Sequence, residues 1–446
     1  MTETLNTAPP ETNQPWYRGV SGYAWLVLVV ASLGWLFDTF DQQLFTLIRN
    51  RSLEDILSRT VSPENLKPVV QYWSYILTSI FLTGFALGGF LFGVLGDKIG
   101  RTRTMMITIF VYAIFTGLNA LVQTPYQYAA CRFLTALGIG GEFGAGASIV
   151  AEVWPARSRP MALGVLQSLS TVGNMMAALV TYLLSNTQWQ YVYLIGIAPA
   201  LLVVFIRLFI KEPESWNRAA SKATASHEEL GSLKALFTER GVSRNTYAAL
   251  LIATAGVLGL WGISYFQTDF LRQMAAAEGY SVAEAQRFTA FIFGLRFQIG
   301  GFIGMYLYAA LSERIGRRPA LVFIYVGALI SIYGAFWGIH EINQAKVWSF
   351  FLGLFTLAPF SAFAVYFPEL FPTRLRSTGV GVCYNAARLV AAVGVWGMGS
   401  VAAQFVSATD PVYGYRIAAT IMSSLYLFGF IGLWLAPETR GKPLPE

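Results

Sequence analysis

The chain has 446 residues, of which 55% are hydrophobic, and its mean hydropathy is +0.52. Charged residues make up only 12%, about half the fraction usual in soluble domains, so the composition excludes an ordinary soluble protein. Repeated apolar stretches of about 20 residues or more predict membrane-spanning helices, because a helix of that length crosses a hydrocarbon core of about 30 Å.

The chain order predicts two sets of six spans on either side of a polar linker. A polar tail, residues 1–21, comes first and lacks the pattern of a signal peptide. The first bundle, 22–210, is expected to hold spans at 22–48, 71–96, 104–123, 127–151, 160–185 and 189–210. The linker, 211–244, is expected to form a short amphipathic helix on the membrane face. The second bundle, 245–435, is expected to hold spans at 245–271, 286–311, 319–339, 347–371, 377–405 and 412–435, before a tail at 436–446.

The positive charges predict the orientation of these spans. With the N-terminus in the cytoplasm, 20 of the 31 Lys and Arg residues fall on the cytoplasmic side and 8 on the outer side. Cytoplasmic loops of membrane proteins are enriched in Lys and Arg, so we expect both termini to be cytoplasmic, in a plasma membrane. The net charge of +7 then reflects orientation and does not indicate a nucleic-acid partner.

Two motifs occur once in each half of the chain. "GDKIGRTR" at 96–103 is echoed by "SERIGRRP" at 312–319, and "EVWPARSR" at 152–159 is echoed by "ELFPTRLR" at 369–376. The matched register of acids and arginines predicts an internal duplication and two pseudo-symmetric bundles. Each motif places an acid at one helix end and arginines near another. Such pairs are predicted to form a conformational latch between helix ends, from Asp97, Arg101, Glu152, Arg159, Glu313, Arg317, Glu369 and Arg376.

These motifs resemble those of the major facilitator superfamily. "GVLGDKIGRTR" resembles its signature loop between the second and third spans, and residues 132–164 resemble its sugar-porter-like branch. "YFPELFPTRLRSTGVGVCYNAARLVAAVG" at 366–394 and "FDTFD" at 37–41 resemble proton symporters of sialate, aromatic acids and other organic acids. The resemblance implies an all-α membrane fold of twelve helices, a central cavity and alternating access. The seventh span lacks the Gln-Leu-Ser element of true sugar porters, and Glu313 replaces the usual aspartate.

Three arginines fall inside predicted spans, and two of them, Arg296 and Arg388, lie near mid-bilayer. Helix rise places Arg388 about 16 Å and Arg296 about 15 Å deep. Arginine stays charged and offers two parallel donors to a carboxylate, so both are predicted to bind an anionic substrate. The alternative is that they form structural ion pairs. Nearby polar and aromatic residues are predicted to shape the pocket or, alternatively, to be ordinary packing: Tyr384, Asn385, Gln298, Trp261 and Tyr265.

Three acids in the first bundle are predicted to carry the coupled proton. Asp38 and Asp41 share one face of the first span, and Glu142 lies in the fourth. The two histidines, His227 and His340, fall in loops, so no histidine is expected inside the membrane. Burial favours the protonated form of a carboxyl group, which suits these acids to proton transfer. Packing, or pairing with the arginines of the second half, is the alternative.

These features predict a secondary active transporter, with proton-coupled symport of a small organic anion such as sialate or an aromatic acid. The alternatives are a neutral sugar or polyol carrier, an exporter of amphiphilic compounds, or a sensor that binds without translocation. An enzyme is not expected, because the chain shows no metal-binding spacing, nucleophile elbow or phosphate loop. The expected partners are the substrate, protons and the lipid bilayer, without a cofactor or a metal, and a monomer is the expected state.

Overall fold

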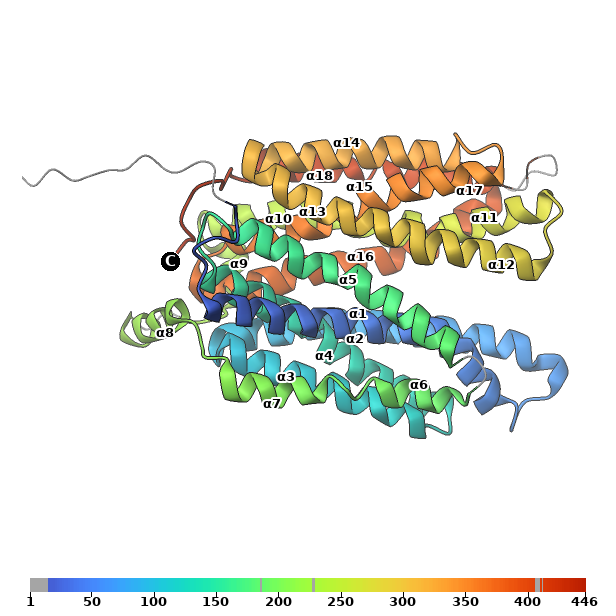
Figure 1. Ribbon diagram of the computed structural model, residues 1–446, viewed down its shortest axis with the longest axis horizontal. Helices are drawn as coiled ribbons and strands as arrows, with labels where there is room; N and C mark the ends of the chain where they lie inside the picture. The colour runs from blue at the N-terminus through green and yellow to red at the C-terminus, as the bar shows by residue number, and fades with distance from the viewer. Residues whose placement is uncertain (1–14, 185–186, 227–228, 406–409, 411) are drawn as a thin grey trace, which may run out of the picture.

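The computed structural model describes residues 15–184, 187–226, 229–405, 410 and 412–446. The described residues form helices and no strands, and two bundles lie side by side along their length (Figure 1). The first bundle consists of α1 (Gly22–Leu57), α2 (Pro63–Lys98), α3 (Arg101–Leu118), η1 (Asn119–Leu121), α4 (Pro125–Val153), α5 (Arg159–Leu183), α6 (Trp189–Ile195) and α7 (Ala200–Phe209).

Two short helices follow α7, α8 (Glu214–Ser226) and α9 (Leu233–Thr238). They lie at one end of the molecule, together with the C-terminal tail, and we call this the α8/α9 end (Figure 1). The second bundle consists of α10 (Val242–Leu258), η2 (Gly259–Ser264), α11 (Tyr265–Ala277), α12 (Val282–Phe291), η3 (Ile292–Phe297), α13 (Gln298–Ile315), α14 (Arg317–Phe336), η4 (Ile342–Gln344), α15 (Ala345–Leu370), η5 (Thr373–Leu375), α16 (Arg376–Gln404), α17 (Tyr413–Ser423) and α18 (Tyr426–Leu435).

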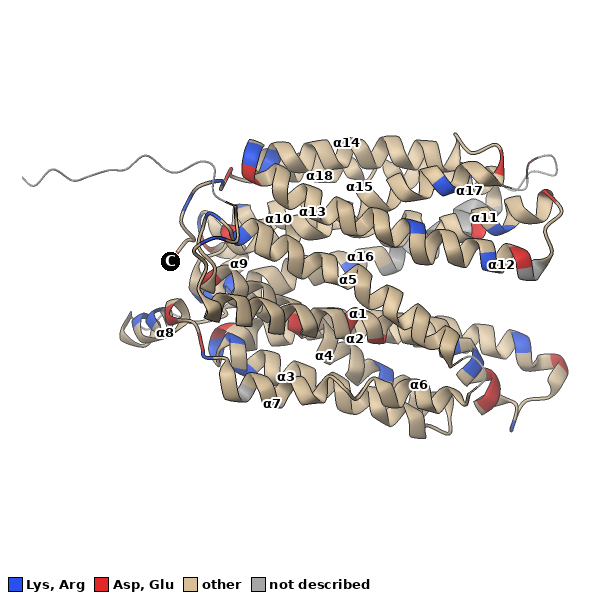
Figure 2. Cartoon of the chain, viewed as in Figure 1, with Lys and Arg blue, Asp and Glu red and all other residues tan. Residues whose placement is uncertain are grey.

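The helices agree with the predicted all-α membrane fold. Within the described residues, ten stretches of helix are long and apolar enough to span a membrane. The 29-residue α16 and the pair α6 and α7 bring the crossings to the twelve expected. Charged residues gather at the two ends of the bundles, and the middle is mostly uncharged (Figure 2). The bundle limits at residues 210 and 245 stay a prediction.

The structure corrects the sixth predicted span, 189–210, which is not one helix. α6 ends at Ile195, and α7 begins at Ala200 after a turn that contains Pro199. Proline has no N–H to donate to the preceding turn, so the helix is interrupted there. The seventh and eighth crossings contain a different irregularity, because η2 and η3 are π-helical turns.

The two bundles approach closely where α2 meets α16. A Cβ atom added to Gly381 of α16 would lie 2.5 Å from the backbone oxygen of Gly89 in α2. Only glycine permits this separation of the two backbones. The contact brings the middle of α16, which carries Arg388, against the first bundle.

Candidate functional site

A cavity of about 80 Å³ lies between the bundles. Both bundles contribute to its wall, and polar side chains from α5 face aromatic ones from η2, η3, α15 and α16. Arg388 is the one charged residue among the described residues that line it. The other lining residues are Trp35, Thr39, Gln42, Gln43, Gln167, Ser170, Asn174, Leu260, Trp261, Phe293, Phe297, Gln298, Met305, Leu357, Phe360 and Tyr384.

Arg388 is held by two rings and one amide. Its guanidinium carbon lies 4.0 Å from the ring centroid of Tyr384 and 4.0 Å from that of Phe85, which belongs to the other bundle. Its Nη1 donates to Oδ1 of Asn385 at 2.6 Å. Arg388 is only 4% exposed, and its Nε has no hydrogen-bond partner within the described part of the chain. No carboxylate there pairs with it, so the ion-pair alternative is not observed.

Two of the predicted acids, Asp38 of α1 and Glu142 of α4, lie against each other. Their carboxyl groups are within hydrogen-bonding reach, and both residues are buried. Glu142 also packs on Gly34, where an added Cβ would lie 1.8 Å from Oε1. Within the described residues, no N–H or hydroxyl group donates to either carboxylate. An acid pair without donors accommodates a shared proton better than two negative charges.

The third predicted acid, Asp41, has a different environment. Its Oδ2 accepts from Nη1 of Arg132 at 3.2 Å, and its Oδ1 accepts from the hydroxyl of Thr116 at 2.7 Å. Arg132 also donates from Nε to Asn119 at 3.0 Å and is fully buried. Asp41 is therefore paired with an arginine of its own bundle, and the predicted pairing with arginines of the second half is not observed.

The structure brings some of the predicted pocket residues together and leaves others apart. Trp261, Gln298 and Tyr384 line the cavity with Arg388, whereas Asn385 lies behind Arg388. Arg296 does not line it. Its side chain is exposed, and its guanidinium carbon lies 5.9 Å from the ring centroid of Phe291. Tyr265 begins α11, but its side chain lies outside the described residues.

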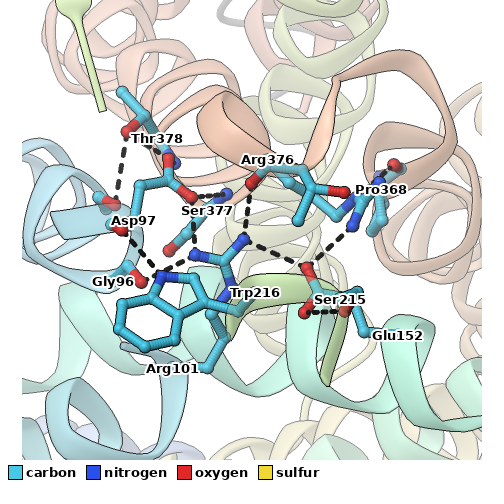
Figure 3. A network of polar contacts seen from close by, with 12 residues as sticks. Gly96, Asp97, Arg101, Glu152, Ser215, Trp216, Pro368, Arg376, Ser377 and Thr378 are labelled. Atoms are coloured by element: carbon cyan, nitrogen blue, oxygen red, sulfur yellow. Dashed lines mark hydrogen bonds and ion pairs between the residues drawn. The ribbon is translucent and has the colours of Figure 1, made fainter. Parts of the chain in front are cut away.

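At the α8/α9 end, Asp97 of α2 reaches across to the N-terminus of α16 (Figure 3). Its carboxylate accepts from the backbone N–H groups of Ser377 at 3.1 Å and Thr378 at 2.8 Å, and from the Thr378 hydroxyl at 2.6 Å. Arg101 forms an ion pair with the same carboxylate at 2.8 Å. An acid at a helix N-terminus satisfies N–H groups that have no partner within the helix.

Glu152 of α4 joins arginines from both bundles beside Asp97 (Figure 3). Its Oε1 accepts from Arg101 at 3.0 Å and from Arg376 of α16 at 2.7 Å, while Oε2 accepts from Ser215 of α8 at 3.0 Å. Arg376 also donates to the backbone oxygen of Pro445 in the C-terminal tail. We refer to Asp97, Arg101, Glu152, Arg376, Ser377 and Thr378 as the inter-bundle network.

In the second copies of the motifs, the acids Glu313 and Glu369 have partners in the second bundle and its tail among the described residues. Arg317 donates to both carboxylate oxygens of Glu369, at 3.0 and 2.9 Å, and pairs with Glu313 at 3.3 Å. Thr439 of the tail donates to Glu369 at 2.5 Å. Arg159, the counterpart of Arg376, forms no ion pair with the described residues and donates to the backbone oxygen of Trp154 at 3.4 Å.

A family model described as "Sugar (and other) transporter" matches residues 25–446 of this chain. The chain belongs to this family of the major facilitator superfamily. Its members are membrane transporters, so the expectation that the protein is not an enzyme is confirmed by the family. The multi-pass topology follows from the same match and from the helices described above.

Two relatives and one solved structure are similar to this chain over most of its length. A cis,cis-muconate transport protein of Acinetobacter baylyi is 30% identical over 71% of this chain and 76% of its own length. A niacin transporter of the same organism is 27% identical over 95% of this chain and 96% of its own length. The proton:xylose symporter XylE bound to 6-bromo-6-deoxy-D-glucose has a TM-score of 0.75 at 18% identity, over 95% of this chain and 98% of that structure, which shows the shared fold.

Sequence reasoning missed two groups of residues in this member of the sugar-transporter family. Gln167, Ser170 and Asn174 line the cavity from α5. Their spacing of three and four residues makes a polar stripe on one helical face, which is the signal that could have identified them.

The second missed group consists of two helix caps. Glu212 accepts from the backbone N–H of Thr102 at the start of α3, at 3.1 Å. Glu438 accepts from the N–H of Arg317 at the start of α14, at 2.9 Å. Each acid follows the last helix of its bundle, in "KEPES" and "APETR". The two acids cap equivalent helices, but they do not match in sequence register, because Pro213 follows Glu212 whereas Pro437 precedes Glu438.

Proposed function

We propose that the protein is a proton-coupled symporter of a small organic anion that works by alternating access. The observation that carries this proposal is Arg388, a buried guanidinium on the cavity wall without an ion pair to the described carboxylates. A buried charge without a partner is costly in a membrane protein and marks a substrate pathway by default. A substrate carboxylate would supply the missing negative charge.

The remaining wall of the cavity suits a planar or conjugated acid. Trp35, Trp261, Phe360 and Tyr384 offer flat apolar surfaces, and Gln167, Asn174 and Gln298 offer amide groups to polar substituents. The names of two relatives, for cis,cis-muconate and niacin, favour the same class of acid. Sialate and other metabolites remain within the proposed class.

For the coupled proton, we assign the pair formed by Asp38 and Glu142. Two buried carboxylates in contact repel each other when both are ionised, so the pair is a natural site for one proton. Asp41 is a weaker candidate, because its charge is already balanced by Arg132. The two parts of the mechanism would thus lie in different bundles, the proton in the first and the anion contact in the second.

The proposed latch is the inter-bundle network, which ties the bundles together at the α8/α9 end. The excess of Lys and Arg there supports a cytoplasmic location for this end and for both termini. We therefore assign the structure to a conformation closed toward the cytoplasm. Its opening would require the contacts of Asp97 and Glu152 with α16 to break.

A neutral sugar or polyol is the second candidate substrate. The amides of Gln167, Asn174 and Gln298 in the cavity favour it, because amides donate to and accept from hydroxyl groups equally well. The fold shared with a proton:xylose symporter is consistent with it. A sugar would leave Arg388 without a counter-charge, which is why the anion is preferred.

Uptake into proteoliposomes with an imposed proton gradient tests the proposal. The panel consists of nicotinate, benzoate, cis,cis-muconate, sialate and xylose. We expect accumulation of at least one acid, and Arg388→Ala should raise its KM about 10- to 100-fold, because a hydrogen-bonded contact to a charged group is lost. The exposed Arg314→Ala is the control for loss of one positive charge. Accumulation of xylose alone, or normal uptake by Arg388→Ala, would refute the anion proposal.

The same vesicles test the proton site and the second arginine. Asp38→Asn and Glu142→Gln should abolish accumulation driven by the gradient while leaving exchange of internal for external acid. If both variants still accumulate the acid, the proton is carried elsewhere. Arg296→Ala distinguishes the two predicted arginines, because its exposed side chain in the structure argues for unchanged uptake.

A further inference from the structure

Asn385 connects the cavity to the contact between the bundles. It lies one helical turn before Arg388 on α16 and is fully buried. Its Oδ1 accepts from Nη1 of Arg388 at 2.6 Å. Its Nδ2 donates to the backbone oxygen of Gly381 at 2.8 Å in its own helix and to that of Gly140 at 3.3 Å, in α4 of the other bundle. Both ends of one amide are therefore used, one toward the cavity and one toward the first bundle.

The first bundle has a notch that fits this amide. A Cβ atom added to Gly89 of α2 would lie 1.9 Å from Nδ2 of Asn385, so the side chain occupies the space that any other residue at position 89 would fill. The first bundle also supplies Phe85, whose ring stacks on the Arg388 guanidinium at 4.0 Å. Two contacts from the first bundle, through Gly140 and Phe85, thus fix the orientation of an arginine in the second.

These contacts depend on the bundles being together at the α8/α9 end. The inter-bundle network closes the same α2–α16 contact nearer the helix ends, through Asp97, Ser377 and Thr378. When the bundles separate at this end, α16 moves away from α2 and α4. The Asn385 amide then loses Gly140, and the Arg388 guanidinium loses the Phe85 ring.

We propose that Asn385 is a positioning residue that makes the orientation of Arg388, and hence the affinity for the substrate carboxylate, depend on which end of the cavity is closed. The inference rests on the proposed function, because it takes Arg388 as the anion contact. With the α8/α9 end closed, Asn385 and Phe85 hold the guanidinium toward the cavity. With that end open, the guanidinium is released and the acid dissociates more readily. The acid is thereby bound tightly when it enters from the end opposite the α8/α9 end, which we call the far end. It is bound weakly when it enters from the α8/α9 end.

The test measures KM for entry from each side, in right-side-out and inverted membrane vesicles. The probe is the acid of the panel above that the wild type accumulates fastest. We expect the wild type to show the lower KM from the far end. Asn385→Ala should raise that KM about tenfold, as for a lost hydrogen bond to a charged group. The KM from the α8/α9 end should change less than about twofold, because the bond is already broken there.

Two further variants keep the test decisive. Phe85→Leu removes the other contact from the first bundle and should shift the ratio of the two KM values in the same direction by a few-fold. The Phe85→Leu variant also tests the inference if the Asn385→Ala variant does not fold. Asn119→Ala is the matched control, because Asn119 is an equally buried amide that accepts from Arg132 at 3.0 Å within one bundle. It should leave the ratio of the two KM values unchanged.

Each outcome has one meaning. A rise in KM from the far end alone supports the inference. An equal rise from both sides, or no change in either, overturns it while leaving Arg388 as the anion contact. If the wild type carries none of the acids, the proposed function fails and the inference fails with it.

Discussion

Asp97 and Glu313 occupy equivalent positions in the two repeats, yet their carboxylates have different partners. Asp97 is fully buried and accepts from three donors at the start of α16, in the other bundle. The Glu313 side chain is 29% exposed and, among the described residues, forms an ion pair only with Arg317 of its own bundle. The same motif therefore joins two bundles in the first copy and stabilises one bundle in the second.

The difference originates in the helices that could receive each acid. α16 begins with Arg376, Ser377 and Thr378, and the equivalent residues of α5 are Arg159, Pro160 and Met161. Pro160 has no N–H and Met161 has no hydroxyl, so α5 offers Glu313 fewer donors. The two copies of the motif are alike, but the residues that face each copy decide which one joins the two bundles.

The largest expected effect comes from the acids Glu152 and Glu369. Glu152→Gln leaves Arg376 buried without its anion and leaves Arg101 with Asp97 alone, so we expect the closed state to lose about 3 kcal/mol or more. Spin labels at Arg103→Cys and Arg314→Cys, in a Cys131→Ser background, should then report a longer distance at the α8/α9 end. Glu369→Gln should lower the melting temperature without lengthening that distance. If both variants lengthen it equally, the comparison between the copies is wrong.

Asp97→Asn and Glu313→Gln come next. Asp97→Asn removes a charge that accepts three hydrogen bonds from α16, so the closed state should lose about 1.5–3 kcal/mol. Glu313→Gln removes a partly exposed ion pair and should cost about 1 kcal/mol or less. The same label distance should lengthen only for Asp97→Asn. An unchanged distance in that variant would show that the cap on α16 does not hold the bundles together.

A smaller effect is expected from Thr378→Val, which keeps the shape of the side chain and removes the hydroxyl bond to Asp97. We expect the closed state to lose about 1 kcal/mol. Ser377→Ala is the matched control, because Ser377 contacts Asp97 through its backbone N–H and its hydroxyl has no partner among the described groups. The fraction of closed molecules, from the same labels, should fall for Thr378→Val alone.

The smallest effect concerns Glu438, which lies outside the membrane spans. Burial alone would raise the pKa of Glu438, but the backbone N–H groups of Arg317, Arg318, Thr439 and Arg440 lower it below its ordinary value of 4.5. Its contribution, about 1 kcal/mol, is therefore present above pH 4.5 and lost as the pH falls below that value. The melting temperatures of wild type and Glu438→Gln should differ at pH 7 and converge as the pH falls below 4.5. A constant difference would mean that Glu438 does not titrate with folding.

Much of the fold could be predicted, because its signals are local. Apolar length gave eleven of the twelve crossings as single stretches, and the repeated motifs identified four of the six residues in the inter-bundle network: Asp97, Arg101, Glu152 and Arg376. Ser377 and Thr378 were missed because they act through N–H groups as much as through side chains. The break at Pro199 was visible in the sequence but was not used.

The site was harder to predict, because helix rise gives the depth of a residue but not the direction of its side chain. Arg296 and Arg388 have similar predicted depths, yet only Arg388 lines the cavity. Arg296 lies in the π-helical turn η3, which adds a residue to the turn and rotates the following face. The directions of the two acids could not be predicted either. Asp38 and Asp41 share one helical face in the sequence, yet Asp38 contacts Glu142 and Asp41 pairs with Arg132.

The order of the inter-bundle network along the chain has a consequence for biogenesis. Asp97, Arg101 and Glu152 are synthesised before residue 155, whereas Arg376, Ser377 and Thr378 follow more than 220 residues later. During that interval the first bundle can insert and pack, but Asp97 and Glu152 lack their partners on α16, and water must take the place of those partners. Arrival of α16 is thus the step that removes water from this end, and a ribosome stalled before residue 376 would hold an incomplete chain with a wet, accessible Glu152.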